Sequence, residues 1–227
     1  MAFRGLGADA LPFLTALGFH QTKEWFEANR EIYETALKEP LGDFVEDLAG
    51  KLAKAKIPLT GDRRSSLFRI HRDVRFAKDK SPYKTNVAAA LSRSGSKNDP
   101  GLLYLHVSPT EGCFAAAGFY RPAPEQLTRL RRAVEREPTS FRRMTNALKK
   151  TELKLSGEDA AKRASAEFAS LTDPELLNAV RLKSFFCLRM LPEGRIHEPR
   201  LVDDMLDFAK DASPLLRWGW SALADER

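Results

Sequence analysis

The chain has 227 residues, of which 43% are hydrophobic and 30% are charged, and its net charge is +6. This composition excludes general disorder, and the length suits one domain over residues 1–227 with a sizeable core. No run reaches the ~18 apolar residues that cross a bilayer. Asp9 and Pro12 interrupt the N-terminal stretch where a signal peptide has its apolar centre. We therefore expect a cytoplasmic protein with no membrane partner.

Residues 1–57 are predicted to be helical. A short helix runs from Leu11 to a C-cap at Gly18, and a second begins after Thr22, whose hydroxyl suits an N-cap. A third helix is expected to begin at Pro40, because proline is favoured in the first helical turn.

Residues 67–120 have the pattern of a β-sheet. Apolar and polar side chains alternate with period two, which is typical of half-buried strands, and short connections favour an antiparallel meander. The turn at 109–112 predicts a hairpin between the last two strands. The four expected strands are Phe68–Phe76, Asn86–Ser92, Gly101–Ser108 and Cys113–Tyr120.

The remainder, residues 121–227, is predicted to be mainly helical. Helices are expected after Pro122, at the Asp173–Pro174 pair, and as two amphipathic segments beyond Pro199. Residues 182–191 are consistent with a further strand. The predicted fold class is α+β, with a central antiparallel sheet of about four to five strands flanked by N-terminal and C-terminal helices.

The most highly charged stretch is FRIHRDVRFAKDKSPYK, residues 68–84. Its last sixteen residues hold six cations against two acids, a net +4, so most of the surplus charge of the chain is concentrated there. An anionic partner usually offsets the self-repulsion of such a cluster. The alternative is a solvated edge strand, which lysines and a proline protect from pairing. The six cations are Arg69, Arg72, Arg75, Lys78, Lys80 and Lys84.

Arg72 breaks the alternation, because it falls on the apolar face between Ile70 and Val74. A guanidinium stays charged in a protein, so an inward arginine must meet a carboxylate, carbonyl groups or a bound anion. A structural ion pair with a buried acid, or a bulge that turns Arg72 outward, are the alternatives to a ligand site.

Three residues outside these six cations join the candidate ligand site. Tyr83 lies inside the cationic stretch, and Lys183 and Arg189 belong to the possible strand at 182–191. If that strand pairs near Arg72, both cations would enlarge the pocket.

His106 is the one candidate for acid–base chemistry. It shares a strand face with Tyr104 and Ser108, and the ordinary pKa of histidine, ~6.5, suits a proton carrier. The alternative is a satisfied structural donor. Glu111 is the nearest acid in the sequence, but a glutamate in a turn is usually solvated.

Motifs of several enzyme classes are missing from the sequence. It has no phosphate loop, dinucleotide fingerprint, HExxH helix or nucleophile elbow, and its four histidines are scattered. We therefore expect no metal and no cofactor. Cys113 and Cys187 form no metal-ligand spacing and are predicted to be buried packing residues.

The cationic stretch resembles the signature of the domain of unknown function 2461 family, grouped from bacterial and fungal proteins. The resemblance covers almost the whole chain in the right order but implies no particular activity. Relatives tend to have glycines and a tryptophan before the proline where this chain has Ala115–Ala117 and then GlyPheTyrArgPro, so a glycine-lined surface is not implied here. The other matching segments are EWFEANREIYE (24–34), GLLYLHVSP (101–109), GFYRPAPEQLTRLR (118–131) and LKSF (182–185).

Three functions remain open. The first is binding of a phosphate-bearing or other anionic small ligand, with possible catalysis by fixed cations. The second is nucleic-acid binding through backbone phosphates. The third is an interaction module that docks an acidic protein partner. The sequence leaves the oligomeric state and the ligand undecided.

Overall fold

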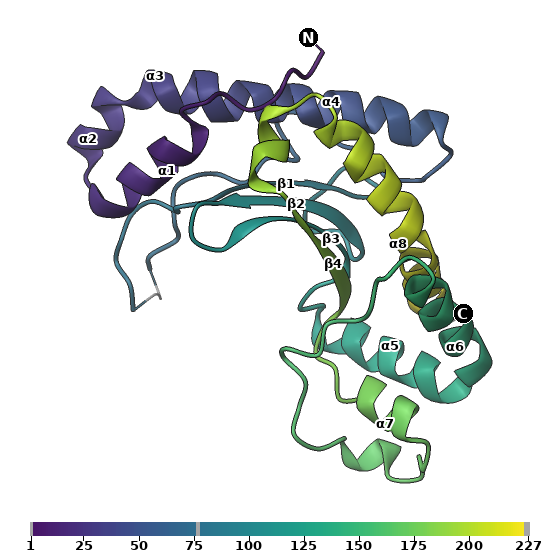
Figure 1. Cartoon of the computed structure of the whole chain (residues 1–227). Helices are drawn as coiled ribbons and strands as arrows, with labels where there is room; N and C mark the ends of the chain where they lie inside the picture. Colours follow the sequence, from purple (N-terminus) through teal and green to yellow (C-terminus); the bar gives the residue numbers. More distant parts are fainter. Residues whose placement is uncertain (1, 76–77, 225–227) are drawn as a thin grey trace.

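The computed structural model describes residues 2–75 and 78–224 and has an α+β fold (Figure 1). At its centre is a four-stranded antiparallel sheet in the order β1-β2-β3-β4, as the predicted fold class required. The strands are β1 (Val87–Leu91), β2 (Leu102–Ser108), β3 (Gly112–Phe119) and β4 (Phe185–Leu191).

The N-terminal helices form a layer against one face of the sheet (Figure 1). Thr22 caps the second helix as predicted, since its Oγ accepts a hydrogen bond of 3.3 Å from the amide of Trp25. The helix predicted from Pro40 does not start afresh there. It continues from a π-helical turn, in which the amide of Glu39 donates to the carbonyl of Glu34. Pro40 has no amide hydrogen to donate, and such a turn is one way to include it in a continuous helix. The elements are α1 (Ala10–Phe19), α2 (Lys23–Ala28), α3 (Arg30–Tyr33), η1 (Glu34–Lys38) and α4 (Glu39–Lys54).

The C-terminal third is mainly helical, as predicted. The Asp173 carboxylate accepts hydrogen bonds from the amides of Glu175 and Leu176 and so caps α7. The two helices expected beyond Pro199 are one, because the buried face continues past Pro214 and packing holds both halves in line. The elements are α5 (Pro124–Arg136), α6 (Pro138–Lys149), η2 (Ala166–Phe168), α7 (Pro174–Ala179), η3 (Glu193–His197) and α8 (Leu201–Ala224).

The strand predicted over Phe68–Phe76 is wrong, although Phe76 itself lies outside the described residues. In the described part of this segment only isolated bridges occur, from Leu67 to Ala89 and from His71 to Tyr83. The segment folds back on itself instead, because backbone hydrogen bonds of 2.8 Å join residues 70 and 72 to residues 84 and 82. The fourth strand is β4, which confirms the possible strand at 182–191.

The two faces of the sheet differ. Leu103, Leu105 and Val107 point into the core, which α4 and α8 cover. On the opposite surface, which we call the open face, Tyr120 and Met190 are exposed and the other large apolar side chains are half-buried. His106 is buried there. Its residues are Ala88, Ala90, Leu102, Tyr104, His106, Phe114, Ala116, Gly118, Tyr120, Phe186, Leu188 and Met190.

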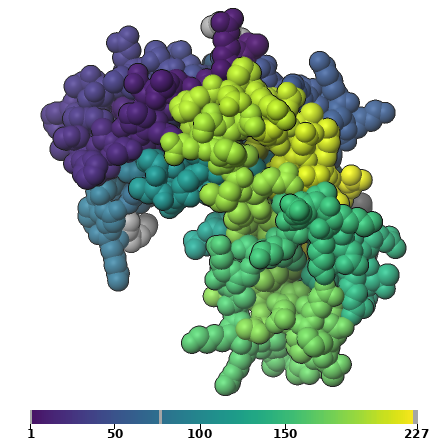
Figure 2. All heavy atoms as spheres, in the orientation of Figure 1, coloured from purple at the N-terminus to yellow at the C-terminus, as the bar shows by residue number. Residues whose placement is uncertain are grey.

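Figure 2 shows a hollow beneath the sheet, between the segments around residues 72–75 and 78–82 and the lobe that contains α5–α7. The open face borders this hollow (Figures 1 and 2). No helix formed by residues 2–75 or 78–224 is long and apolar enough to cross a membrane. The cytoplasmic location and the single domain stay predictions.

Candidate functional site

Two lysines meet over one aromatic ring beside the open face. The ammonium of Lys84 lies 5.8 Å from the centroid of Phe68, and that of Lys97 lies 5.5 Å from it. Lys97 comes from the β1–β2 loop, and its Nζ donates a 2.8 Å hydrogen bond to the carbonyl of Leu67. The Phe68 ring in turn meets Tyr104 edge to face at 5.8 Å. The two cations therefore lie beside the open face.

Three positively charged side chains act on the pKa of Lys84. Burial lowers the pKa of Lys84 first, and the charges of Arg69, Arg72 and Lys97 lower it further. No carboxylate of a described residue is among the groups that act on this pKa. We call these four side chains, Arg69, Arg72, Lys84 and Lys97, the cationic rim. A bound anion would relieve their mutual repulsion.

Two arginines of the predicted site have acid partners in their own loop. Arg72 pairs with Asp79, and Arg75 pairs with Asp73 at 2.8 Å. Hydrogen bonds from Arg75 hold the pKa of Asp73 below its ordinary value. The acid that meets Arg72 is exposed, so neither the buried ion pair nor the apolar strand face of the sequence prediction is present.

The remaining cations of the stretch point to solvent, and Tyr83 points away from them. Lys78 and Lys80 are exposed, and Lys80 Nζ donates to the carbonyl of Val74 at 2.9 Å. Tyr83 is buried and stacks on Phe26 at a centroid distance of 4.5 Å. Tyr83 therefore packs against the N-terminal helices and does not line the rim.

Lys183 and Arg189 do not enlarge the cationic site, which corrects that expectation. β4 pairs with β3, whereas the segment of Arg72 lies beyond β1, so the whole sheet separates them. Arg189 instead donates to Asp211 of α8 at 2.8 Å and lies over the ring of Phe208. Its role here is to attach β4 to α8.

His106 is held between a phenol and a carboxylate on the open face. Its Nδ1 lies 3.1 Å from the Tyr104 hydroxyl, and its ring stacks on Phe114 at 4.6 Å. Its Nε2 lies 2.8 Å from a Glu111 oxygen, although the angle is too poor for a well-formed hydrogen bond. Glu111 is exposed, as expected of a glutamate in a turn, and the turn also brings one of its oxygens to the histidine.

This arrangement favours a neutral imidazole. Burial lowers the pKa of His106, and the charge of Glu111 opposes that shift only in part. Burial also raises the pKa of Tyr104 to about 12, so the phenol keeps its proton. The Tyr104 hydroxyl and Nδ1 share a hydrogen bond whose donor is set by the tautomer of the neutral ring. Such surroundings suit a structural histidine.

Residues 9–218 match the protein family described as a conserved hypothetical protein, DUF2461. The chain belongs to this family. No curated protein and no solved structure matches the chain. The DUF2461 match spans the sheet, the cationic rim and most of α8, so the candidate site lies wholly within the family region.

Sequence reasoning missed three contributors to the site: Phe68 as a platform, Lys97, and Tyr104 as its neighbour. Lys97 sits in a serine-rich loop, where periodicity carries no signal. That loop is organised by Asp99, whose carboxylate accepts from the Ser94 amide at 2.9 Å. The only available signal was charge, one lysine in a polar run, which is common in solvated loops.

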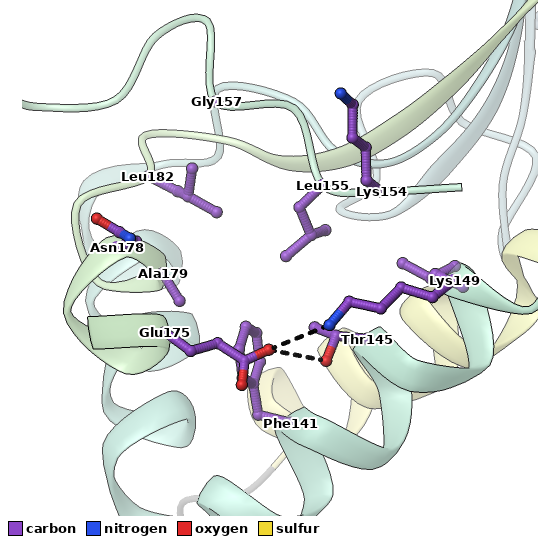
Figure 3. Close-up of a pocket in the computed structure, with 11 residues that line it drawn as sticks. Phe141, Thr145, Lys149, Lys154, Leu155, Gly157, Glu175, Asn178, Ala179 and Leu182 are labelled. Carbon is purple, nitrogen blue, oxygen red and sulfur yellow. Dashed lines mark hydrogen bonds and ion pairs between the residues drawn. The ribbon is translucent and has the colours of Figure 1, made fainter. Parts of the chain in front are cut away.

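A separate cavity of about 270 Å³ lies between α6, α7 and the segment that follows α6 (Figure 3). Its walls are largely apolar, and the Glu175 carboxylate lies 3.8 Å from Lys149 and 3.4 Å from the Thr145 hydroxyl. The Glu175 carboxylate of this cavity thus has a cation of the same wall beside it. No group of three or more His, Cys, Asp or Glu side chains among the described residues is placed to hold a metal ion.

Proposed function

We propose that the chain binds a phosphate-bearing or other anionic ligand at the cationic rim, with the rest of the ligand on the open face. The observation that carries the proposal is the pair of lysines over Phe68, one of them partly buried, with no described carboxylate acting on Lys84. Bringing like charges together costs free energy, which an anion between them would offset.

The lysines and arginines of the rim can contact a phosphate in different ways. Lys84 and Lys97 supply point charges, and a guanidinium can donate hydrogen bonds to two oxygens of one phosphate. The exposed Arg72–Asp79 pair contributes at most about 1 kcal/mol, so a phosphate can replace Asp79 at little cost. His106 and Tyr104 lie on the same surface, within reach of a ligand that extends from the rim across β2.

A thermal-shift series tests the proposal with inorganic phosphate and a mononucleotide on the wild type, Lys84→Gln and Lys97→Gln. The control is Lys54→Gln, which removes one exposed charge from the end of α4. Phosphate should stabilise the wild type and the control by about 2.7 kcal/mol at 100 times the dissociation constant. The stabilisation should be largely lost in both rim variants. Equal stabilisation of all four proteins would refute the proposal.

A further inference from the structure

The open face has room and chemistry for more than one anionic group. We propose that its ligand is a single-stranded nucleic acid, whose bases stack on the exposed rings while its phosphates meet the cations. This inference rests on the proposed function at one point only, the phosphate held at the cationic rim.

Aromatic rings cross the sheet from the rim to β4. Phe68 contacts Tyr104 at 5.8 Å on β2, and Tyr120 at the end of β3 contacts Phe186 of β4 at 5.4 Å. Tyr120 is 60% exposed, an unusual state for a large aromatic side chain. We call Phe68, Tyr104, Tyr120 and Phe186 the aromatic track.

The sheet surface between the rings of β2 and β4 is formed by small residues. Tyr104 pairs with Ala116, and Phe186 pairs with Gly118, so small residues lie between the rings of β2 and β4. Gly118 has φ +131°, and a side chain there would come within 2.3 Å of the Phe185 carbonyl. Small residues on this strand let a flat group approach the sheet closely.

Positive charge occurs at both ends of the aromatic track. The rim lies beside Phe68, and at the far end the Arg121 guanidinium lies 5.2 Å from the centroid of Tyr120. One acid, Glu111, lies beside His106 in the β2–β3 turn. Cations at two separated points suit a chain of phosphates better than one small anion.

Single-strand binding sites combine exposed aromatic rings with cations, and the open face has partly exposed rings with cations beside them. Unpaired bases stack on aromatic side chains whatever their sequence, and a duplex hides its bases from such a surface. A flat apolar patch for a protein partner would lack the cations that border these rings. The cations therefore argue against a purely apolar partner, and the rings favour a nucleic acid over an acidic protein segment.

Fluorescence anisotropy tests the inference with a labelled oligothymidylate of about twelve nucleotides, a length within the usual range of single-strand sites. The variants are Tyr120→Ala for the track and Lys84→Gln for the rim. The control is Phe19→Ala, which removes an aromatic ring that is 83% exposed on α1. We expect the oligonucleotide to bind the wild type and the control alike and to bind Tyr120→Ala about 5- to 150-fold more weakly. Phosphate stabilisation should be unchanged in Tyr120→Ala.

The outcomes separate this inference from the function on which it rests. Two results would overturn the nucleic-acid inference and leave anion binding standing. In the first, phosphate binds and the oligonucleotide binds no more tightly than phosphate. In the second, Tyr120→Ala binds the oligonucleotide as tightly as the wild type does. Equal affinity for a duplex of the same length would also overturn it, as would equally effective competition by polyglutamate, which would indicate an acidic protein partner. If neither phosphate nor the oligonucleotide binds, both proposals fail.

Discussion

His106 illustrates how a single residue reflects its surroundings. Burial on a sheet face disfavours its charged form, while the Glu111 carboxylate 2.8 Å away favours it, and the net effect is a lowered pKa. The unfolded chain, with a histidine pKa near 6.5, therefore binds more protons than the folded chain as the pH falls below that value. The lowered pKa of His106 thus reduces the free energy of unfolding below pH 6.5 and leaves it unchanged well above that pH.

Replacing Glu111 with glutamine removes the favourable charge and leaves the burial in place. The pKa of His106 should fall further, and the free energy of unfolding should drop more steeply as the pH is lowered below 6.5. An NMR titration of the imidazole and urea unfolding at several pH values measure both effects. Glu125→Gln, an exposed change in α5, is the control. An unchanged or raised pKa in Glu111→Gln would show that the contact is not formed in solution.

At the scale of elements, α8 decides how closely helix and sheet approach. It crosses β3, and Gly219 lies so near the Phe119 ring that an added Cβ would come within 2.1 Å of it. On the same side, Ala115 and Ala117 of β3 belong to the core. The run Ala115–Ala117 thus contributes one face to helix packing and the other to the open face.

Two glycine-to-alanine changes in helices should therefore have opposite signs. Gly219→Ala forces a methyl group against the Phe119 ring and should cost about 1–3 kcal/mol of unfolding free energy. Gly50→Ala in α4 meets nothing within 4 Å and should gain about 0.5–1 kcal/mol, because alanine loses less backbone freedom on folding. Urea denaturation measures both. A Gly219→Ala protein as stable as the wild type would mean that the ring moves aside freely.

At the scale of the whole molecule, α8 joins parts that the sequence order keeps apart. It packs on α4 of the N-terminal layer, on β3 and β4, and on α5 and α6 of the C-terminal part (Figure 1). Arg189 adds an ion pair of 2.8 Å between β4 and this helix. A helix shared by all layers favours one cooperative unit.

Cooperative unfolding can be followed from two ends of the molecule. Trp25 packs on Phe13 among the N-terminal helices, and Trp218 packs on Phe141 and Phe185 near the other end. Two variants each keep one of these tryptophans and have the other tryptophans replaced by phenylalanine. In each variant, urea unfolding followed by fluorescence should have the same midpoint as unfolding followed by circular dichroism. Fluorescence and circular dichroism midpoints that differ would divide the chain into two units.

Part of the candidate site was predictable because charge density is visible in the sequence. Arg69, Arg72 and Lys84 were identified by the surplus of cations over residues 69–84. Their convergence with Lys97 was not, because the contact of Lys97 with Phe68 depends on how the β1–β2 loop folds over a neighbouring segment. The same limit misplaced Lys183 and Arg189, whose position depends on which strand β4 joins.

The sequence by itself determined the local elements of this DUF2461 protein: the caps at Thr22 and Asp173, the hairpin at 109–112 and the strand within 182–191. These depend on backbone preferences and on neighbours a few residues away. Only the tertiary structure decided that residues 68–84 fold back on themselves, that α8 is one helix, and that two lysines meet over Phe68. Each of these depends on packing and pairing between segments far apart in the chain, for which local preference carries no information.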